Sequence, residues 1–368
     1  MIKVLYLLNH AGRGGTERYV RTLVEQLGDK KIKAYFAFNE DGLLADELKA
    51  LGTDVFRLGM RSRFDIRAAA RLAGLCKRLD IDLIHTQFLR ENYIALLSRL
   101  FNPRVKVVHT NHIIMENDLF TRITNRLLTP LEASFIAVCG KGREAMINNG
   151  IAREKIRVVF NAVDPAYWRN NGGSSLRDEF GIPADAFVFI CVSRLSAEKG
   201  HAFLLRSLAG LKRNCGKAFK CVLAGDGPMM GEIKELAGGL GLSEEVIFAG
   251  FRKDVPNLLH GSDLFVNPSE NEALSYAIIE ALAAGLPVVA SDVGGNGDII
   301  NSGTNCGLLV GYGAEKEMAE ALYKLMSDRE LYGAMKANAV RTVEEIFNLV
   351  KMVDETYNLY KEVKGRKN

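Results

Sequence analysis

Two carboxylates stand in an apolar segment near the middle of the second half of the chain. The stretch from Pro268 to Gly295 reads PSENEALSYAIIEALAAGLPVVASDVGG and contains Glu272 and Glu280. The apolar residues around Glu280 predict a mostly buried helix, roughly from Leu274 to Ala284, where an unpartnered carboxylate is costly. If both were helical, the two carboxylates would lie about 12 Å apart along the axis and within about 80° of one face. We therefore expect them to grip two ends of one extended ligand; the alternative is a solvated Glu280, with Glu272 at the positive end of the helix.

Two cations follow a strand-like run in the segment VSRLSAEKG. Arg194 and Lys199 come directly after the run FVFICV, and Gly200 lets the chain turn into the next helix. Arginine supplies a fork of donors and lysine a point charge, so the pair suits a diphosphate. The alternative is two ordinary surface cations.

A glycine-rich loop follows the first predicted strand. The segment NHAGRGGTER holds Gly12, Gly14 and Gly15 before the first predicted helix. The backbone there can approach a phosphate or sugar closely, and a helix N-terminus favours an anion. The loop lacks the Gly-Lys-Ser/Thr ending of a Walker loop and the spacing of the dinucleotide fingerprint.

The histidines and the short acidic motif do not predict a metal site. His109 ends the strand-like run VKVVHT, and His112 follows it without a third ligand at suitable spacing. For each histidine alone, including His85, structural hydrogen bonding is favoured. Asp80 and Asp82 precede a strand, at the end of the sheet opposite the expected site.

The elements that must position these residues are short apolar strands alternating with helices. Runs such as KVLYLLN, VKVVHT, FVFICVS and LPVVAS are rich in Val, Ile and Phe. Continuously apolar strands that alternate with helices predict doubly wound α/β domains with parallel sheets. The segments KVLYLLNHAGRGG and FVFICVSRLSAEKG begin the two halves alike, which predicts two Rossmann-like domains with ligand loops at the carboxyl ends of their strands.

The domain boundaries are expected where the periodicity breaks. Residues 170–175, NNGGSS, interrupt it, and we place the linker in this region. The prediction is an N-terminal Rossmann-like domain over 1–168, a C-terminal Rossmann-like domain over 169–345, and a last helix over 346–368 that crosses back to the first domain.

Composition narrows the class of protein. The 368 residues allow two domains, and a net charge of +4 argues against a general nucleic-acid partner. Six scattered cysteines without a C-x-x-C pair suit reduced thiols. The first apolar run is too short for a signal sequence, and no run of about twenty apolar residues follows. A cytoplasmic protein is expected, with membrane contact only at its surface.

Taken together, the motifs resemble the retaining glycosyltransferases of family four, which have the GT-B fold of two Rossmann-like domains facing across a cleft. The segments that carry the resemblance occur in family order: GGTER, VVHTNH, AVCGKGR, VVFNAVD, VSRLSAEKG, LAGDGP, VIFAGF and the Glu272 to Glu280 segment with GLPVVASDVGG. The usual Glu-Gly-Phe-Gly is replaced by EALS, which leaves the donor sugar open.

The resemblance implies roles for individual residues. His109 lies beside the reacting centre, and Glu272 contacts the donor sugar. The residues implied in donor binding are Gly14, Gly15, Arg194, Lys199, Ala273, Leu274, Ser275 and Glu280. Arg194 and Lys199 bind the diphosphate, Glu280 binds the ribose hydroxyls, and the amides of residues 273–275 help to hold sugar and phosphate.

The implied activity is transfer from a nucleotide-sugar donor, expected to be a UDP-sugar, to a glycan or lipid-linked acceptor. Bacterial cell-surface polysaccharide or glycolipid synthesis is the expected setting, and neither a metal nor another cofactor is expected. Two alternatives remain: another nucleotide-sugar enzyme of the same architecture, such as an epimerase, and a sugar-nucleotide-binding protein without turnover.

A basic segment raises the question of a membrane. Arg63, Arg67 and Arg71 fall at i, i+4 and i+8, one stripe of a predicted helix. Near anionic lipid, such cations attract by about 1 kcal/mol each. Because lipid-linked acceptors are frequent in the family, we expect peripheral contact with the inner face of the membrane; a solvated helix face is the alternative.

Overall fold

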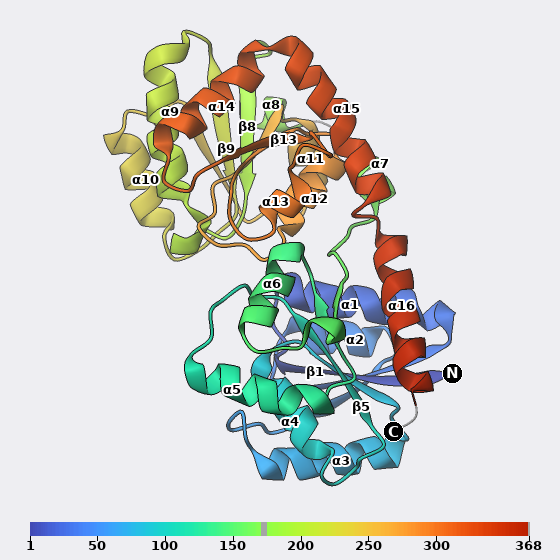
Figure 1. Cartoon of the computed structure of the whole chain (residues 1–368). Coiled ribbons are helices and arrows are strands. Elements are labelled where there is room, and N and C mark those ends of the chain that lie inside the picture. The colour runs from blue at the N-terminus through green and yellow to red at the C-terminus, as the bar shows by residue number, and fades with distance from the viewer. Residues whose placement is uncertain (171–174, 367–368) are drawn as a thin grey trace. The chain divides into compact units, whose positions relative to one another are not determined.

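The computed structural model describes residues 1–170 and 175–366, and it consists of two α/β units (Figure 1). Contacts within the chain divide it into a first unit, Met1–Asn161 with Val350–Asn368, and a second unit, Ala162–Leu349. Each unit holds one wholly parallel sheet between helices. The predicted α/β class with two Rossmann-like domains is confirmed.

The first unit contains a seven-stranded sheet in the order β3-β2-β1-β4-β5-β6-β7. Its strands form because continuous apolar runs are covered on both faces, as the full burial of Leu5 and Leu7 illustrates. The strands are β1 (Ile2–His10), β2 (Ile32–Glu40), β3 (Asp54–Arg57), β4 (Leu83–Thr86), β5 (Lys106–Asn111), β6 (Ser134–Ala137) and β7 (Ile156–Val158). The helices are α1 (Gly15–Leu27), η1 (Gly28–Lys30), α2 (Leu43–Ala50), α3 (Ile66–Leu79), α4 (Leu89–Ser98), α5 (Leu119–Leu128), η2 (Thr129–Leu131), α6 (Gly140–Asn148), η3 (Arg153–Lys155) and α16 (Leu349–Gly365).

The second unit contains a six-stranded sheet in the order β10-β9-β8-β11-β12-β13. The strands are β8 (Phe187–Val192), β9 (Phe219–Ala224), β10 (Val246–Gly250), β11 (Leu264–Asn267), β12 (Val288–Ser291) and β13 (Gly307–Val310). The helices are α7 (Pro165–Asn170), α8 (Leu176–Glu179), η4 (Ala197–Lys199), α9 (His201–Cys215), α10 (Met230–Gly239), α11 (Val255–His260), α12 (Tyr276–Ala283), α13 (Asn296–Ile299), α14 (Glu315–Ser327) and α15 (Arg329–Glu345).

Both sheets reverse their strand order once, and ligands of open α/β sheets bind at such a reversal. In the first sheet the reversal lies between β1 and β4, where Leu7 pairs with Thr86. In the second it lies between β8 and β11, where Phe265 pairs with Ile190. The loops that leave the carboxyl ends of these four strands are therefore the positions where a site is expected.

The last helix, α16, completes the first unit. Its buried side chains include Met352, Leu359 and Tyr360, and the Tyr360 hydroxyl lies 3.3 Å from that of Tyr6 in β1. Figure 1 shows the red helix α16 beside the blue first strand.

The two crossings of the chain between the units lie side by side. Val163 forms an isolated parallel bridge with Asn348. The Val163 amide donates to Phe347 O at 3.1 Å, and the Leu349 amide donates to Val163 O at 3.0 Å. Residues 171–174 of the expected linker lie outside the described part of the chain.

The predicted arginine stripe is wrong at its first position. Helix α3 begins at Ile66, because the Asp65 carboxylate caps it by accepting from the Ala68 amide at 3.0 Å. Arg63 therefore lies in the preceding loop, where it donates to the Thr121 hydroxyl of α5 at 3.4 Å. Among the described residues, every helix is too short or too polar to cross a membrane.

Candidate functional site: the carboxyl ends of the strands

In the second unit, the loops after β8 and β11 meet at the strand-order reversal. Gly200 ends the β8 loop with φ of +66°, and a Cβ there would come within 1.9 Å of Pro268 O. A side chain at this position is excluded both by the backbone conformation and by the neighbouring carbonyl. The Glu270 amide also donates to Glu198 O at 2.9 Å, so the two loops are joined by their backbones.

This meeting brings the predicted Lys199 and Glu272 together. Lys199 Nζ lies 2.7 Å from Glu272 Oε1, and the side chains are 24% and 13% exposed. The hydroxyl of Ser269, itself buried, donates to the same carboxylate oxygen at 2.8 Å. A partly buried ion pair with an added hydrogen bond holds both charges at the carboxyl end of the sheet.

The other cation of the β8 loop, Arg194, is exposed, and its charge lowers the pKa of a second carboxylate, Glu198. The pKa of Glu198 is lowered, first by the hydrogen bond from the Ser196 hydroxyl at 2.6 Å. The charges of Lys199 and Arg194 lower it further. Two cations and two carboxylates thus gather at the reversal.

The expected helix between the two glutamates is shorter than predicted. Helix α12 starts at Tyr276, because the Ser275 hydroxyl accepts from the Ile278 amide at 3.4 Å as an N-cap. Glu272 lies in the loop before this cap, so the distance and angle calculated for two helical glutamates do not apply. Glu280 lies on α12 and is 7% exposed, which contradicts a solvated carboxylate.

The backbone of the loop after β12 packs against Glu272 and Ala273. This contact was not predicted from the sequence. Gly294 has φ of +51°, and a Cβ there would lie 1.5 Å from Glu272 O. Gly295 N donates to Ala273 O at 2.8 Å. The glycine pair after the apolar run VVAS was the available signal. Ser269 carried no signal, because its contact with Glu272 depends on the loop conformation.

In the first unit, His109 lies within β5, two residues before its end at Asn111, and is held as a neutral imidazole. Its Nδ1 lies 2.9 Å from Thr86 Oγ1, and that hydroxyl donates to Asn92 Oδ1 at 3.0 Å. The Thr86 oxygen then accepts from Nδ1–H, which leaves Nε2 with the lone pair. Burial lowers the pKa of His109 to about 3, so the ring is uncharged at neutral pH.

Two further histidines extend this neutral cluster. His85 Nδ1 lies 2.6 Å from the Tyr360 hydroxyl and its Nε2 lies 2.7 Å from Thr110 Oγ1, as expected for structural hydrogen bonding. His112 Nε2 lies 2.8 Å from Gln87 Oε1. Burial lowers the pKa of His112 to about 3 and that of His85 well below its usual value.

The glycine loop follows β1, beside the reversal of the first sheet. Gly14 precedes α1 in an extended conformation, and a Cβ there would lie 2.8 Å from Glu17 Oε2. A Cβ at Gly12 would lie 2.5 Å from His10 Nε2. Gly14 and Gly15 are exposed, so their backbone is accessible at the N-terminus of α1.

The carboxylate of Asp82 has structural partners at the other end of the first sheet. Asp82, of the short acidic motif, accepts from the Lys3 amide at 2.9 Å and from Lys364 Nζ at 2.8 Å. Within residues 1–170 and 175–366, no group of three or more His, Cys, Asp or Glu is arranged to hold a metal ion.

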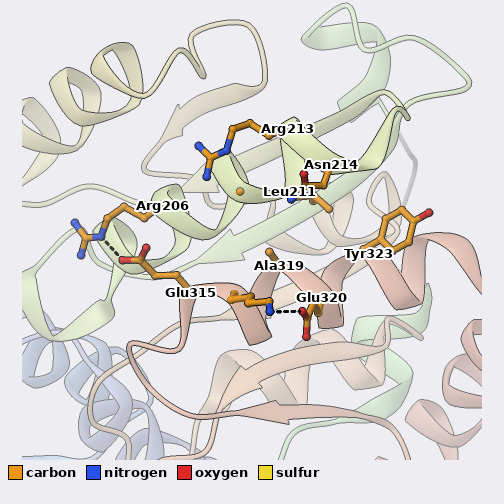
Figure 2. A pocket seen from close by; sticks show the side chains of 10 residues that line it. Arg206, Leu211, Arg213, Asn214, Glu315, Ala319, Glu320 and Tyr323 are labelled. Atoms are coloured by element: carbon orange, nitrogen blue, oxygen red, sulfur yellow. Dashed lines mark hydrogen bonds and ion pairs between the residues drawn. The ribbon is translucent and has the colours of Figure 1, made fainter.

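A cavity of about 530 Å³ lies elsewhere in the second unit, between α9 and α14 (Figure 2). Arg206 pairs with Glu315 across it at 2.6 Å, and Lys316 lies 3.8 Å from Glu320. None of the predicted site residues lines this cavity. The residues that can do chemistry gather instead at the strand ends.

Two Rossmann-like units with polar loops at their strand-order reversals define the architecture of a GT-B enzyme. Comparison with family models agrees: residues 13–167 match "Glycosyltransferase Family 4" and residues 174–342 match "Glycosyl transferases group 1". The chain belongs to glycosyltransferase family four and is a glycosyltransferase.

Two relatives in sequence bear on this assignment. The putative glycosyltransferase EpsF of Bacillus subtilis is 30% identical over 308 residues, which cover 79% of each chain. A Campylobacter jejuni enzyme, N-acetylgalactosamine-N,N'-diacetylbacillosaminyl-diphospho-undecaprenol 4-alpha-N-acetylgalactosaminyltransferase, is 28% identical over 95% of this chain and 97% of its own.

Solved structures share the fold at lower identity. A glycosyltransferase from Rickettsia africae has a TM-score of 0.89 at 21% identity, covering 100% of this chain and 99% of its own. Anabaena HepE in complex with UDP and glucose has a TM-score of 0.85 at 24% identity, covering 98% and 100%.

Proposed function

We propose that this protein is a retaining glycosyltransferase that moves a sugar from a UDP-sugar to a glycan or lipid-linked acceptor in bacterial cell-surface polysaccharide or glycolipid synthesis. HepE, a neighbour in fold, was solved with UDP and with UDP-glucose. Two relatives have diphospho-undecaprenol acceptors in their names, the Campylobacter jejuni enzyme and an Escherichia coli galactosyltransferase that is 27% identical. These names support a UDP-sugar donor and a lipid-linked acceptor.

The observation that carries the proposal is the Lys199–Glu272 pair across the strand-order reversal. A donor diphosphate offers Lys199 a stronger partner than a single carboxylate, and Arg194 lies exposed in the same loop. Exchange of partners frees Glu272 to accept hydrogen bonds from the sugar hydroxyls. The same two cations then stabilise the negative charge that develops on the leaving diphosphate.

The remaining donor contacts follow from position. Glu280 binds the ribose hydroxyls, because these hydroxyls can donate hydrogen bonds to a buried carboxylate in place of water. The amides of Ala273, Leu274 and Ser275, next to the start of α12, hold sugar and phosphate where the helix dipole favours negative charge. In the first unit, the backbone of Gly14 and Gly15 approaches the donor.

Transfer proceeds with retention on the leaving-group face. The bond between the anomeric carbon and the phosphate oxygen breaks, and the acceptor oxygen bonds to that carbon from the same face. The departing phosphate oxygen takes the acceptor proton. With a pKa of about 3, His109 is too weak a base to remove that proton efficiently at neutral pH. Its Nε2 lone pair instead accepts from a sugar hydroxyl, beside the reacting centre.

Catalysis under this proposal needs no metal, because Arg194, Lys199 and the start of α12 already supply fixed positive charge at the diphosphate. The test is transfer in excess EDTA, with the anomeric configuration of the product read by NMR. Full activity and a retained configuration are expected. Activity that is lost in EDTA and restored by a divalent ion contradicts the metal-independent step, and an inverted product contradicts the mechanism.

A further inference from the structure

Helix α5 of the first unit buries its polar side and exposes its apolar side. Its buried positions, Thr121 and Asn125, are polar, each 5% exposed, and the adjoining Thr129 is equally buried. The side chains on its opposite face are apolar and exposed, by 71% for Leu119, 59% for Phe120, 52% for Ile123 and 72% for Leu127. We call these four residues the outer face of α5. A soluble amphipathic helix normally shows the reverse arrangement.

Buried hydrogen bonds fix this orientation. Asn125 Oδ1 accepts from the Tyr93 hydroxyl at 2.7 Å, and its Nδ2 donates to Asn149 O at 3.0 Å. The Thr129 hydroxyl donates to Asn125 O at 2.7 Å. Rolling the helix to bury its apolar side would break the bonds of the Asn125 side chain to Tyr93 and Asn149 and leave these buried groups unpaired, which is costly. The exposure of the outer face is therefore built into the packing.

The apolar surface continues from the outer face into neighbouring segments. Phe64, 39% exposed, stacks on Tyr93 at 5.3 Å and meets Phe120 edge-on at 6.5 Å. Met115, in the segment before α5, is 54% exposed. Figure 1 shows α5 at the edge of its unit beside α4. A contiguous exposed surface of this kind marks an interaction site.

Three arginines lie around the outer face, against two exposed acidic residues just before the helix, Glu116 and Asp118. Arg122 and Arg126 are exposed on α5 itself, and the helix carries no acidic residue after its N-cap Asp118. The Arg63 guanidinium lies 5.4 Å from the rings of both Phe64 and Phe120. Exposed apolar side chains among cations match the acyl and headgroup regions of an anionic bilayer.

We propose that the outer face of α5 inserts into the surface of an anionic bilayer, with Arg63, Arg122 and Arg126 at the headgroups. The charge argues for lipid over a second copy of the chain, because a two-fold contact through this face would place the same cations against each other. The reason for docking rests on the proposed function, since a lipid-linked acceptor lies at such a bilayer. The surface itself is independent of that function.

The test is flotation of the purified full chain with vesicles of equal parts phosphatidylcholine and phosphatidylglycerol. Binding is expected, together with weaker binding to phosphatidylcholine alone and at high salt. Ile123→Glu and Leu127→Glu should each lower the partition coefficient by ~10-fold or more, because an apolar side chain that enters the bilayer is replaced by a charge. Leu51→Glu, at a 49% exposed position after α2, is the matched control and should bind like the parent.

Several outcomes overturn the proposal: absence of binding to the mixed vesicles, equal loss with Leu51→Glu, or unchanged binding of both α5 variants. A concentration-dependent dimer that Leu127→Glu dissolves assigns the face to a second copy instead. Thermal unfolding confirms that the variants are folded, and Leu127→Ser serves where the glutamate variant is not.

Hydrolysis of the nucleotide-sugar donor without acceptor separates this proposal from the proposed function. Vesicle binding without any turnover of the donor leaves the docking surface intact and removes the function. Normal turnover in all variants, with no vesicle binding by the parent, removes the docking surface alone.

Discussion

The two units place polar residues near the same position of the same kind of sheet, but these residues are charged in one unit and uncharged in the other. At the reversal of the second sheet, Lys199 and Glu272 carry charge and are partly accessible to solvent. Beside the reversal of the first sheet, on β4 and β5, His85 and His109 are buried and uncharged, and hydroxyl groups are their partners. The topology fixes where a site forms, whereas the side chains decide which chemistry it supports.

The difference suits each unit to a different kind of ligand group. Charged groups that are paired with each other suit an anion, because a diphosphate can replace one partner of the pair. A dry, neutral cluster suits an uncharged polyol, because its hydroxyls exchange hydrogen bonds without moving a charge out of water. Under the proposed function, the donor diphosphate is the anion and the transferred sugar is the uncharged polyol.

The largest effect is expected from removal of the Lys199 ammonium group in the second unit. Lys199→Ala should lower turnover by ~100-fold or more, because a preorganised charge at the leaving group is lost. Lys316→Ala, a 90% exposed lysine on α14, controls for loss of a positive charge and should leave turnover unchanged. Steady-state rates on the folded variants measure this. Near-normal turnover of Lys199→Ala would remove the basis for assigning the diphosphate to this unit.

The two carboxylates should separate binding from transfer. Glu280→Gln should weaken affinity for free UDP by ~10-fold or more, because hydrogen bonds to a charged acceptor are lost. Glu272→Gln should spare UDP affinity and lower the transfer rate, because its proposed partner is the sugar. Calorimetry with UDP decides between them. Equal loss of affinity in both variants contradicts this division of roles.

The neutral cluster of the first unit should respond to acid. The folded pKa of His109, about 3, lies below its unfolded value near 6.5, so its neutral burial contributes stability fully above pH 6.5. As pH falls from 6.5 towards 3, the unfolded chain binds a proton that the folded chain excludes.

Denaturant unfolding of the parent and of His109→Gln over that pH range measures this contribution. The free energy of unfolding of the parent should fall relative to the variant by ~1.4 kcal/mol per pH unit. Buried Glu91 and Glu132, whose pKa values are raised to about 7 and about 8 by burial, titrate in both proteins and cancel in the difference. A difference that is independent of pH would mean that His109 is not held neutral.

The smallest effect is expected at the support of Glu272. Ser269→Ala removes one of its hydrogen bonds but leaves Lys199 in place. A loss of ~5-fold in turnover is expected, with little change in UDP affinity, because only the orientation of the carboxylate is affected. Ser262→Ala, whose hydroxyl donates to Leu258 O, is a control outside the site. A fall in UDP affinity as large as that of Glu280→Gln would place Ser269 at the nucleotide instead.

Much of the fold could be predicted because buried parallel strands are apolar throughout. Runs such as FVFICV leave little ambiguity, and the glycines after them indicate the turns. The start of α12 could not be predicted as well, because Ser275 and the residues before it suit both a cap and a first turn. The prediction that Arg63 belongs to a helical arginine stripe was wrong for a similar reason, because spacing alone does not locate the N-cap Asp65.

The candidate site could be predicted as a set of residues but not as a set of contacts. Lys199 and Glu272 are 73 residues apart, and only the strand order brings their loops together. Ser269 and Gly294 act on Glu272 through loop conformation, which local patterns do not specify. The hydroxyl partner of His85, Tyr360, is 275 residues away.

That distance bears on how the protein is made. A ribosome delivers Tyr6 and His85 early, whereas Tyr360 emerges with the last helix, after the whole of residues 162–349. The second unit is continuous in sequence and can fold as soon as it is complete. The first unit must wait with part of its core uncovered until α16 arrives. The unit that begins synthesis first is therefore the one that finishes folding last, and it is the one exposed to chaperones and to aggregation meanwhile.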